Sequence, residues 1–244
     1  MAGQFIDFAN VRDEGQLLDI GSGTGALSFG IVQRKAKVCV VGIDPSKEYV
    51  AHANSSNSVP ERINFEVGDA QHLRFLDATF GSVVSLLVFN FIPDPRKALR
   101  EACRVTKTGS PIVAAVWDYG GEMGMLRTFW DAAAIIDGRA SPLDERHMPL
   151  CRSGELAHLW KSLGLKDVRE QALDIEMRFD SFEDYWRPFL SGQGPAGAYA
   201  TGLEPAVLQR LRDELKHRLS LPGEDVSFVL PARAWAVRGA VPAK

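Results

Sequence analysis

Three glycines at alternate positions, Gly21, Gly23 and Gly25, follow a short apolar run that ends at Ile20. An amphipathic stretch begins directly after them, so the order indicates a strand, a tight turn and the start of a helix. Glycine lets a ligand lie against bare backbone, and the first turn of a helix offers unpaired N–H groups to an electron-rich group. The turn is therefore a candidate cradle for a nucleotide-like ligand, with a purely structural turn as the alternative.

Carboxylates stand at three places that a parallel sheet would bring near this turn. Asp19 precedes the first glycine by two residues, and Asp44 and Asp69 follow the next two apolar runs along the chain. A carboxylate at the end of the second strand suits hydrogen bonding to the two hydroxyls of a ribose. A carboxylate inside the turn would repel a pyrophosphate and attract a sulfonium or amino group. With Asp69 placed to accept from an adenine amino group, the set favours a positively charged nucleoside over a nicotinamide dinucleotide.

Strands that alternate with helices are needed to position these side chains, and the sequence predicts them. The run 38–43 is continuously apolar, which is typical of a strand buried on both faces in a parallel sheet. Residues 96–105 place apolar and charged side chains at helical spacing, so we expect a helix with one buried face. This order indicates a doubly wound, Rossmann-like α/β sheet, in which ligands bind beyond the carboxyl ends of the strands. The strands predicted in this part are residues 17–20, 38–43, 63–67, 83–89 and 112–117.

The pattern changes near residue 120, where glycines and prolines separate shorter helical stripes. We expect residues 1–119 to form the core, residues 120–225 a helical cap that contributes one sheet strand at about 166–179, and residues 226–239 a final strand. That strand would return antiparallel beside the fifth, which gives a mostly parallel seven-stranded sheet. The glycine-rich stretch 191–197 is interpreted either as a solvent loop or as a lid over the site.

The composition limits the class of protein and of partner. The 244 residues are 45% hydrophobic and 24% charged, with a net charge of −3 and no basic run, so no nucleic-acid partner is expected. Cys39, Cys103 and Cys151 are far apart and without metal-ligand spacing, so we interpret them as small buried hydrophobes and expect no metal. No signal peptide or membrane-spanning apolar run is visible, which favours a cytoplasmic protein with no membrane partner.

The residues quoted above resemble the motifs of class I S-adenosylmethionine-dependent methyltransferases. The run 17–25 looks like their first motif, the run 42–46 resembles their ribose-binding acidic loop, and Gly68-Asp69-Ala70 is similar to their adenine-contacting segment. Residues 84–94, continued by 98–101, look like their fourth strand and the helix after it. The resemblance covers residues 15 to about 118 and, within the family, is closest to the small-molecule branch that includes quinone-biosynthesis methyltransferases.

The resemblance implies S-adenosyl-L-methionine as cofactor, S-adenosyl-L-homocysteine as its product, and roles for named residues. Gly21, Ser22 and Gly23 would pack against the methionine part of the cofactor, and Asp19 would help to hold its amino group. Asp44 would hold the ribose. The residues implied to lie at the adenine or near the methyl group are Pro45, Ser46, Asp69, Ala70, Leu87 and Val88. For Leu87 and Val88, packing in the strand core is the alternative.

Three departures from the family pattern concern turns and the N-terminal segment. Residues 80–82 lack the acidic residue that often precedes the fourth strand, and residues 108–111 replace the usual Pro-Gly-Gly turn before the fifth. Both changes affect turns rather than expected ligands. Relatives commonly carry further N-terminal helices that close the substrate pocket. Because the segment before residue 15 is short, we expect a pocket that is more open, or that another segment or a partner covers.

Methyl transfer from a sulfonium is an in-line displacement, so the enzyme contributes mainly alignment and exclusion of water. No convincing general base is visible, and the five histidines are interpreted as solvated or packing residues. Weak catalytic candidates stand after the fourth and fifth strands, and aromatic or polar side chains in the cap could frame a flat acceptor or simply pack in the core. The catalytic candidates are Asn90, Asp118 and Tyr119, and the weak candidates for substrate binding are Asn90, Trp117, Tyr119, Trp186 and Gln193.

The sequence therefore predicts a methyltransferase that acts on a small-molecule acceptor. Two alternatives stay open: a non-catalytic protein that binds S-adenosylmethionine, and a methyltransferase of macromolecules, for which we would expect a basic or peptide-binding groove. A nicotinamide dehydrogenase is disfavoured by Asp19 and by the segment Gly68-Asp69-Ala70. The residues leave open whether oxygen, nitrogen or carbon is methylated, and whether the protein is a homodimer.

Overall fold

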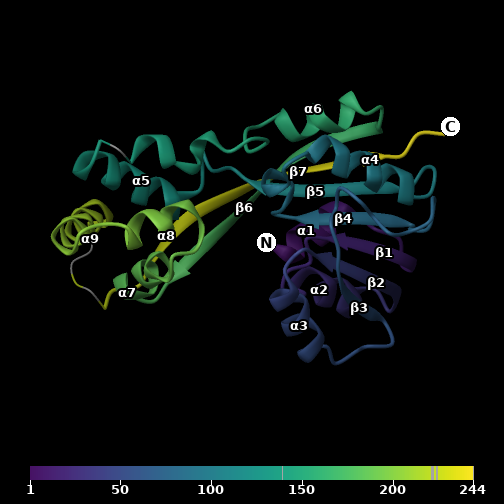
Figure 1. Cartoon of the computed structure of the whole chain (residues 1–244), viewed down its shortest axis with the longest axis horizontal. Coiled ribbons are helices and arrows are strands. Elements are labelled where there is room, and N and C mark those ends of the chain that lie inside the picture. Colours follow the sequence, from purple (N-terminus) through teal and green to yellow (C-terminus); the bar gives the residue numbers. More distant parts are fainter. Residues whose placement is uncertain (139, 221–222, 224, 244) are drawn as a thin grey trace. The chain divides into compact units, whose positions relative to one another are not determined.

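The structure is a computed structural model that describes residues 1–138, 140–220, 223 and 225–243. Its strands form one seven-stranded sheet in the order β3-β2-β1-β4-β5-β7-β6 (Figure 1). The chain divides into two compact units, residues 1–116, 153–173 and 234–244 in the first and residues 117–152 and 174–233 in the second. The strands are β1 (Glu14–Ile20), β2 (Lys37–Asp44), β3 (Ile63–Val67), β4 (Ser82–Leu86), β5 (Pro111–Trp117), β6 (Lys166–Phe179) and β7 (Phe228–Ala240).

The first five strands are parallel, and the order of the chain reverses at β1. Leu18 of β1 pairs with Val41 of β2 on one side and with Val83 of β4 on the other. The chain moves outward from β1 through β2 to β3 and then returns to β4, so the carboxyl ends of β1 and β4 form the switch point at which such sheets bind ligands.

The last strand runs antiparallel beside β5. Asp118 N–H donates to Arg233 O at one end of the pair, and Gly109 N–H donates to Val241 O at the other, at 2.9 and 2.8 Å. The predicted fold class, a mostly parallel seven-stranded sheet whose last strand is antiparallel, is confirmed.

Apolar faces explain the helices of the first unit. In α4 the residues Ala98, Leu99, Ala102 and Val105 are buried, as the spacing predicts. Its start is fixed by Asp94, whose carboxylate accepts from Lys97 N–H at 2.9 Å, and by a proline in the first turn. The helices of this unit are α1 (Ala2–Ala9), α2 (Ala26–Arg34), α3 (Lys47–Ser55), α4 (Pro95–Val105) and α6 (Glu155–Ser162).

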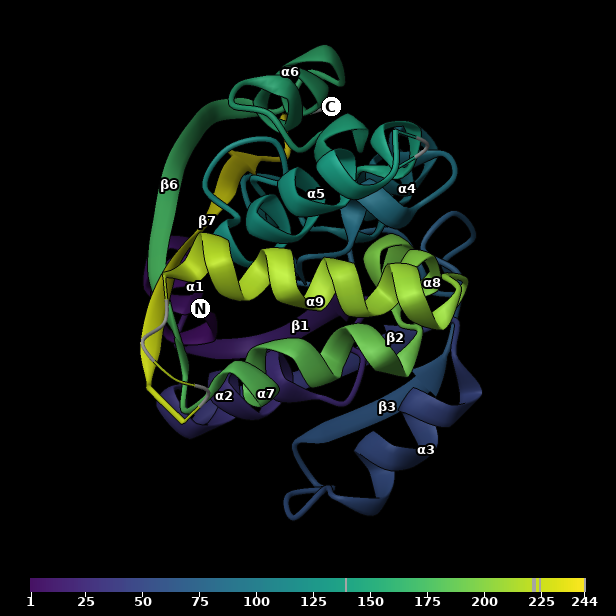
Figure 2. The same cartoon turned by 90° about the vertical axis from the view of Figure 1, so that its left-hand side faces the viewer.

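The second unit has a core of its own, rich in aromatic side chains. Phe129 stacks on Phe189 with ring centroids 4.3 Å apart, and Tyr185 donates from its hydroxyl to Met125 O at 3.0 Å. Helix α9 packs on α5 (Figure 2). The helices of this unit are α5 (Gly124–Ile136), α7 (Phe182–Trp186), α8 (Gly194–Thr201) and α9 (Pro205–Leu219).

Two predicted elements differ from the structure. The strand expected over 83–89 ends at Leu86, because Leu87 has a φ of 66° and residues Phe89–Phe91 form a 3₁₀ turn. The loop expected over 191–197 is wrong from Gly194 onward, where α8 begins with a proline in its first turn. Of the residues 120–225 that the sequence analysis assigns to the cap, 153–173 lie in the first unit. Within the described residues, no helix has the length and apolar character to cross a membrane.

Candidate functional site

The glycine turn is fastened to the end of β2. The backbone N–H groups of Gly21 and Ser22 both donate to Ile43 O, at 2.8 and 2.9 Å. Gly21, Gly23 and Gly25 have φ values of 73°, 53° and 92°, which residues with a side chain rarely adopt. Gly25 is also the N-cap residue of α2. The order of strand, tight turn and helix start is therefore as the sequence predicts.

Gly21 is also required by a close approach from the segment after β4. A Cβ atom on Gly21 would lie 2.4 Å from Val88 Cγ2, which is far inside van der Waals contact. Val88 follows Leu87, whose N–H donates to Ala115 O at 2.7 Å and whose left-handed backbone turns the chain away from the sheet. The absence of a side chain at Gly21 therefore allows the turn after β1 and the turn after β4 to come into contact.

Asp19 is a buried carboxyl group that accepts hydrogen bonding from Ser28. Its side chain is 1% exposed, and its Oδ2 accepts from Ser28 Oγ at 2.7 Å. Asp19 Oδ1 and Ser22 Oγ are both buried without a hydrogen-bond partner among the described residues. Burial raises the pKa of Asp19 to about 7, the bond from Ser28 lowers it in part, and the charge of Asp44 raises it again.

Asp44 is positioned by two backbone donors. Its Oδ2 accepts from Gly23 N–H at 3.0 Å and its Oδ1 from Ser46 N–H at 2.9 Å, so the carboxylate bridges the glycine turn and the start of α3. Ser46 is the N-cap residue of α3 and accepts from Tyr49 N–H at 3.1 Å. A carboxylate has about four lone-pair positions, so Asp44 keeps acceptor capacity for a ligand.

A cavity of about 460 Å³ opens at the ends of β1 and β2 and the segments that follow β3 and β4. Phe91, 55% exposed, contributes an aromatic face to it. Of the residues that the sequence proposes for cofactor binding, Gly21, Pro45, Asp69, Ala70 and Val88 line it. The other lining residues are Ile20, Ile43, Gly68, Gln71, Phe91, Ile92 and Pro93.

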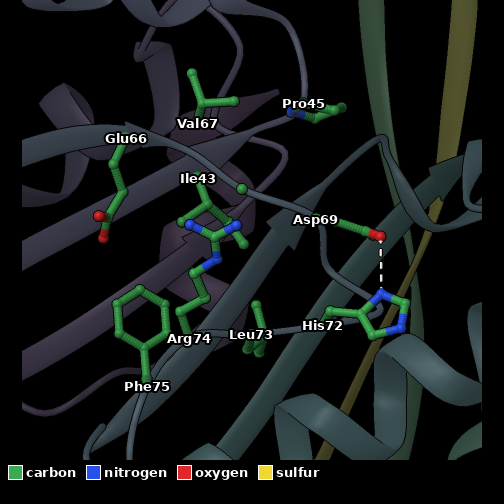
Figure 3. A pocket seen from close by; sticks show the side chains of 10 residues that line it. Ile43, Pro45, Glu66, Val67, Asp69, His72, Leu73, Arg74 and Phe75 are labelled. Atoms are coloured by element: carbon green, nitrogen blue, oxygen red, sulfur yellow. Dashed lines mark hydrogen bonds and ion pairs between the residues drawn. The ribbon is translucent and has the colours of Figure 1, made fainter.

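A second cavity of about 490 Å³ adjoins the first and shares Ile43, Pro45, Gly68 and Asp69 with it. Figure 3 shows this cavity, with the carboxylate of Asp69 facing the imidazole of His72. The pKa of Asp69 is held below its usual range, chiefly because the backbone N–H of Gln71 donates to it. Asp69 is therefore an ionised acceptor at the boundary between the two cavities.

The remaining candidates of the first unit are placed as follows. Asn90 lies in the 3₁₀ turn after β4 and is buried, whereas Leu87 is half-buried and does not line either cavity. Phe91, Ile92 and Pro93 were not predicted as site residues. The signal for them was available, because an apolar run that continues past a strand into a proline places apolar side chains at the strand's carboxyl end.

Most candidates of the second unit are buried or half-buried within it. Asp118 is buried and accepts from Gly121 and Glu122 N–H at 3.1 and 3.2 Å. Burial raises the pKa of Tyr119 far above its usual range, so its phenol stays protonated. Trp186 is 3% exposed and stacks on Phe182 with ring centroids 6.4 Å apart. The two others are Trp117, half-buried at the end of β5, and Gln193, the exposed N-cap residue of α8.

Within the described residues, no group of three or more histidine, cysteine, aspartate or glutamate side chains could hold a metal ion. Cys39 is exposed, Cys103 is half-buried and Cys151 is buried. The interpretation of all three as buried hydrophobes is therefore wrong for Cys39.

Comparisons with known proteins agree with the motifs. Residues 18–114 match the family model described as a methyltransferase domain. Norajmaline N-methyltransferase from Rauvolfia serpentina is 32% identical over 121 residues, which are 46% of this chain and 41% of that protein. A ubiquinone/menaquinone biosynthesis C-methyltransferase from Geotalea daltonii is 31% identical over 103 residues, 41% of this chain and 44% of that protein. The chain thus matches less than half the length of these curated relatives.

The fold is also found in solved structures. The crystal structure of the YcgJ protein from Bacillus subtilis aligns with a TM-score of 0.65 at 19% identity, over 100% of this chain and 98% of that one. Together with the sequence matches, it confirms the resemblance that residues 15–118 indicate.

Proposed function

We propose that this chain, whose residues 18–114 match the model of a methyltransferase domain, binds S-adenosylmethionine at the glycine turn and transfers its methyl group to a small molecule. The observation that carries the proposal is the arrangement of three carboxylates around the turn. Asp19 is buried two residues before it, Asp44 bonds to it, and Asp69 lines the cavity that Gly21 also lines.

The residues present fit the cofactor at its charged end. The unpartnered Asp19 Oδ1 is an acceptor that needs a donor or a cation, and the buried Ser22 Oγ needs a partner as well. A buried carboxylate stabilises a positive charge strongly because little water screens the pair. Asp19 and Ser22 would therefore hold the amino group of the methionine part, directly or through water.

The nucleoside end fits the remaining carboxylates. Asp44 would accept from the ribose hydroxyls, since its geometry is already fixed by Gly23 and Ser46. Asp69 would accept from the adenine amino group, with Pro45 and Ala70 beside the ring, because all three line the same cavity. Bound in this way, the cofactor supplies a methyl group on a positively charged sulfur, and the chain supplies alignment and an apolar surface that excludes water.

The acceptor is proposed to carry its own nucleophile. Asn90 is an amide and no base, Asp118 is engaged by two backbone donors, and Tyr119 stays protonated. A free amine, a phenolate or a stabilised carbanion attacks without a strong general base. The apolar residues Phe91, Ile92 and Pro93 favour an apolar or aromatic small molecule, in keeping with the names of the relatives.

Transfer of a radiolabelled methyl group from S-adenosylmethionine to a cell lysate, fractionated afterwards into small molecules, protein and nucleic acid, tests this function. We expect label in a small organic product with the wild-type chain and none with Asp44→Ala. Label in protein or nucleic acid would instead favour a macromolecular acceptor. Binding of the cofactor without any labelled product would favour a non-catalytic binding protein.

A further inference from the structure

We propose that His72 is a positioning residue for adenine recognition: with Lys97 of α4, it holds the carboxylate of Asp69 at the cavity. The proposal rests on the function proposed above and deepens it, because it states how the acceptor for the adenine amino group is kept in place. His72 is an exposed side chain that the sequence gives no reason to single out.

The carboxylate of Asp69 is held from both of its oxygens. Oδ1 accepts from the backbone N–H and the side-chain amide of Gln71 at 2.8 and 3.2 Å, and Oδ2 lies 3.1 Å from His72 Nδ1 (Figure 3). A carboxylate has about four lone-pair positions. Three are therefore taken by the protein, and one remains for a donor on a ligand.

Lys97 determines which nitrogen of His72 carries the proton. Its Nζ lies 2.5 Å from His72 Nε2. An ammonium is a donor only, so Nε2 must accept and a neutral imidazole carries its hydrogen on Nδ1. That hydrogen donates to Asp69 Oδ2. The order Lys97 to His72 to Asp69 is thus a chain of donors in which each link orients the next.

The same loop is attached to α4 at further points. Gln71 Oε1 accepts from Asp94 N–H at 3.1 Å, next to the start of α4. Further along, Glu101 Oε2 accepts from Leu73 N–H at 2.9 Å and Arg104 Nη2 donates to Leu73 O at 2.8 Å. Asp69 is therefore placed by a rigid helix rather than by its loop alone.

Because His72 and Asp69 are exposed, an effect of His72 on ligand recognition can be measured apart from any effect on stability. The side chains of His72 and Asp69 are 68% and 49% exposed. Exposed pairs of this kind contribute little to the free energy of unfolding. Removal of the imidazole should therefore change ligand recognition and leave the melting temperature nearly unchanged.

The test compares two ligands that differ at one position of the purine. S-adenosylhomocysteine carries the 6-amino donor, whereas S-inosylhomocysteine carries a 6-oxo acceptor that a carboxylate repels. We would measure both dissociation constants by calorimetry for the wild type, His72→Ala, His72→Asn and Lys97→Met. His52→Ala removes another exposed histidine, in α3, and is the matched control.

We expect the wild type to prefer the adenine ligand and His72→Ala to lose about two- to fivefold of that preference, the range for one exposed contact. His72→Asn should restore most of it, because the asparagine amide can donate from near the position of Nδ1. Lys97→Met should lower it, and His52→Ala should not.

Three results would overturn the proposal. An unchanged preference in both His72→Ala and Lys97→Met would show that neither side chain positions Asp69. Equal binding of both ligands by the wild type would show that Asp69 does not read the amino group. Failure of the wild type to bind either ligand would overturn the proposed function itself, which distinguishes the two failures.

Discussion

Asp19 Oδ2 accepts a hydrogen bond of 2.7 Å from the hydroxyl of Ser28, while Asp19 Oδ1 has no partner among the described residues. Burial disfavours the charged form of the carboxyl group more than hydrogen bonding from Ser28 favours it, and the charge of Asp44 adds repulsion. These effects raise the pKa of Asp19 to about 7. The charge of Asp19 therefore changes within the physiological range of pH.

Binding of a cationic ligand should consequently be linked to a proton. Below pH 7 Asp19 is mostly protonated and offers no charge, whereas above it the carboxylate attracts the ammonium group. We predict that affinity for S-adenosylmethionine rises from pH 6 to pH 8 and that binding near pH 7 releases a proton. Calorimetry in buffers of different ionisation enthalpy measures this release.

Asp19→Asn should weaken binding and remove the pH dependence, and Glu14→Gln, at the exposed start of β1, should change neither. A proton release that persists in Asp19→Asn would assign the linkage to another group.

Ionisation of Asp19 should also lower the stability of the ligand-free protein as the pH rises. The folded pKa of Asp19 is raised above its unfolded value of 3.8, so the unfolded chain ionises first. Stability is therefore lost between about pH 4 and pH 7, by at most on the order of 4 kcal/mol. We predict that Asp19→Asn gains stability relative to the wild type from pH 5 to pH 8 in denaturant titrations. A constant difference across this range would contradict the raised pKa.

Gly21→Ala should abolish ligand binding and destabilise the fold. The new Cβ would lie 2.4 Å from Val88 Cγ2, and the alanine backbone would have to keep a φ of 73°. Gly15→Ala is the matched control, because its φ is 102° and nothing lies within 4 Å of the added atom. We expect only about 1 kcal/mol of destabilisation for the control. Equal stability and equal binding in the two variants would show that contact with Val88 does not matter.

The second unit contains a buried ion pair whose loss should be costly. Arg127 and Asp144 are 12% and 5% exposed and bond through both terminal guanidinium nitrogens, one at 3.0 Å. Asp144→Asn would leave the arginine charge without its counter-charge, at a cost of about 3–5 kcal/mol. Asp131→Asn removes the exposed contact with Arg146 and should cost less than about 1 kcal/mol. Chemical denaturation that gives similar losses for both would contradict this.

The positions of the candidate site residues could be predicted where their signals are local in the sequence. The glycine turn and the carboxylates Asp19, Asp44 and Asp69 each lie next to an apolar run, so the end of a predicted strand places them. Parallel strands then gather them at one edge of the sheet. The alternation of strands with helices was predicted on the same basis, and the expected antiparallel return of β7 beside β5 is also found.

The rest depends on contacts between distant residues. The role proposed for His72 depends on its contact with Lys97, 25 positions away. The residues next to His72 in the sequence do not predict that contact. Leu87 adopts a left-handed backbone that its residue type does not favour, so the end of β4 was predicted too late. The sequence could not predict the place of Trp186, because an aromatic side chain can line a substrate pocket or pack in a core. In the structure it is buried.

Calorimetric titration of S-adenosylhomocysteine into the wild type and Asp44→Asn tests the proposed cofactor site most directly. Asp44 bridges Gly23 and Ser46, so the asparagine variant keeps an acceptor while losing the charge that the ribose hydroxyls would meet. We predict one ligand per chain for the wild type and binding about tenfold to a hundredfold weaker for the variant, the range for hydrogen bonds to a charged group. No heat of binding with the folded wild type, or identical affinity in the two proteins, would contradict the assignment of this site.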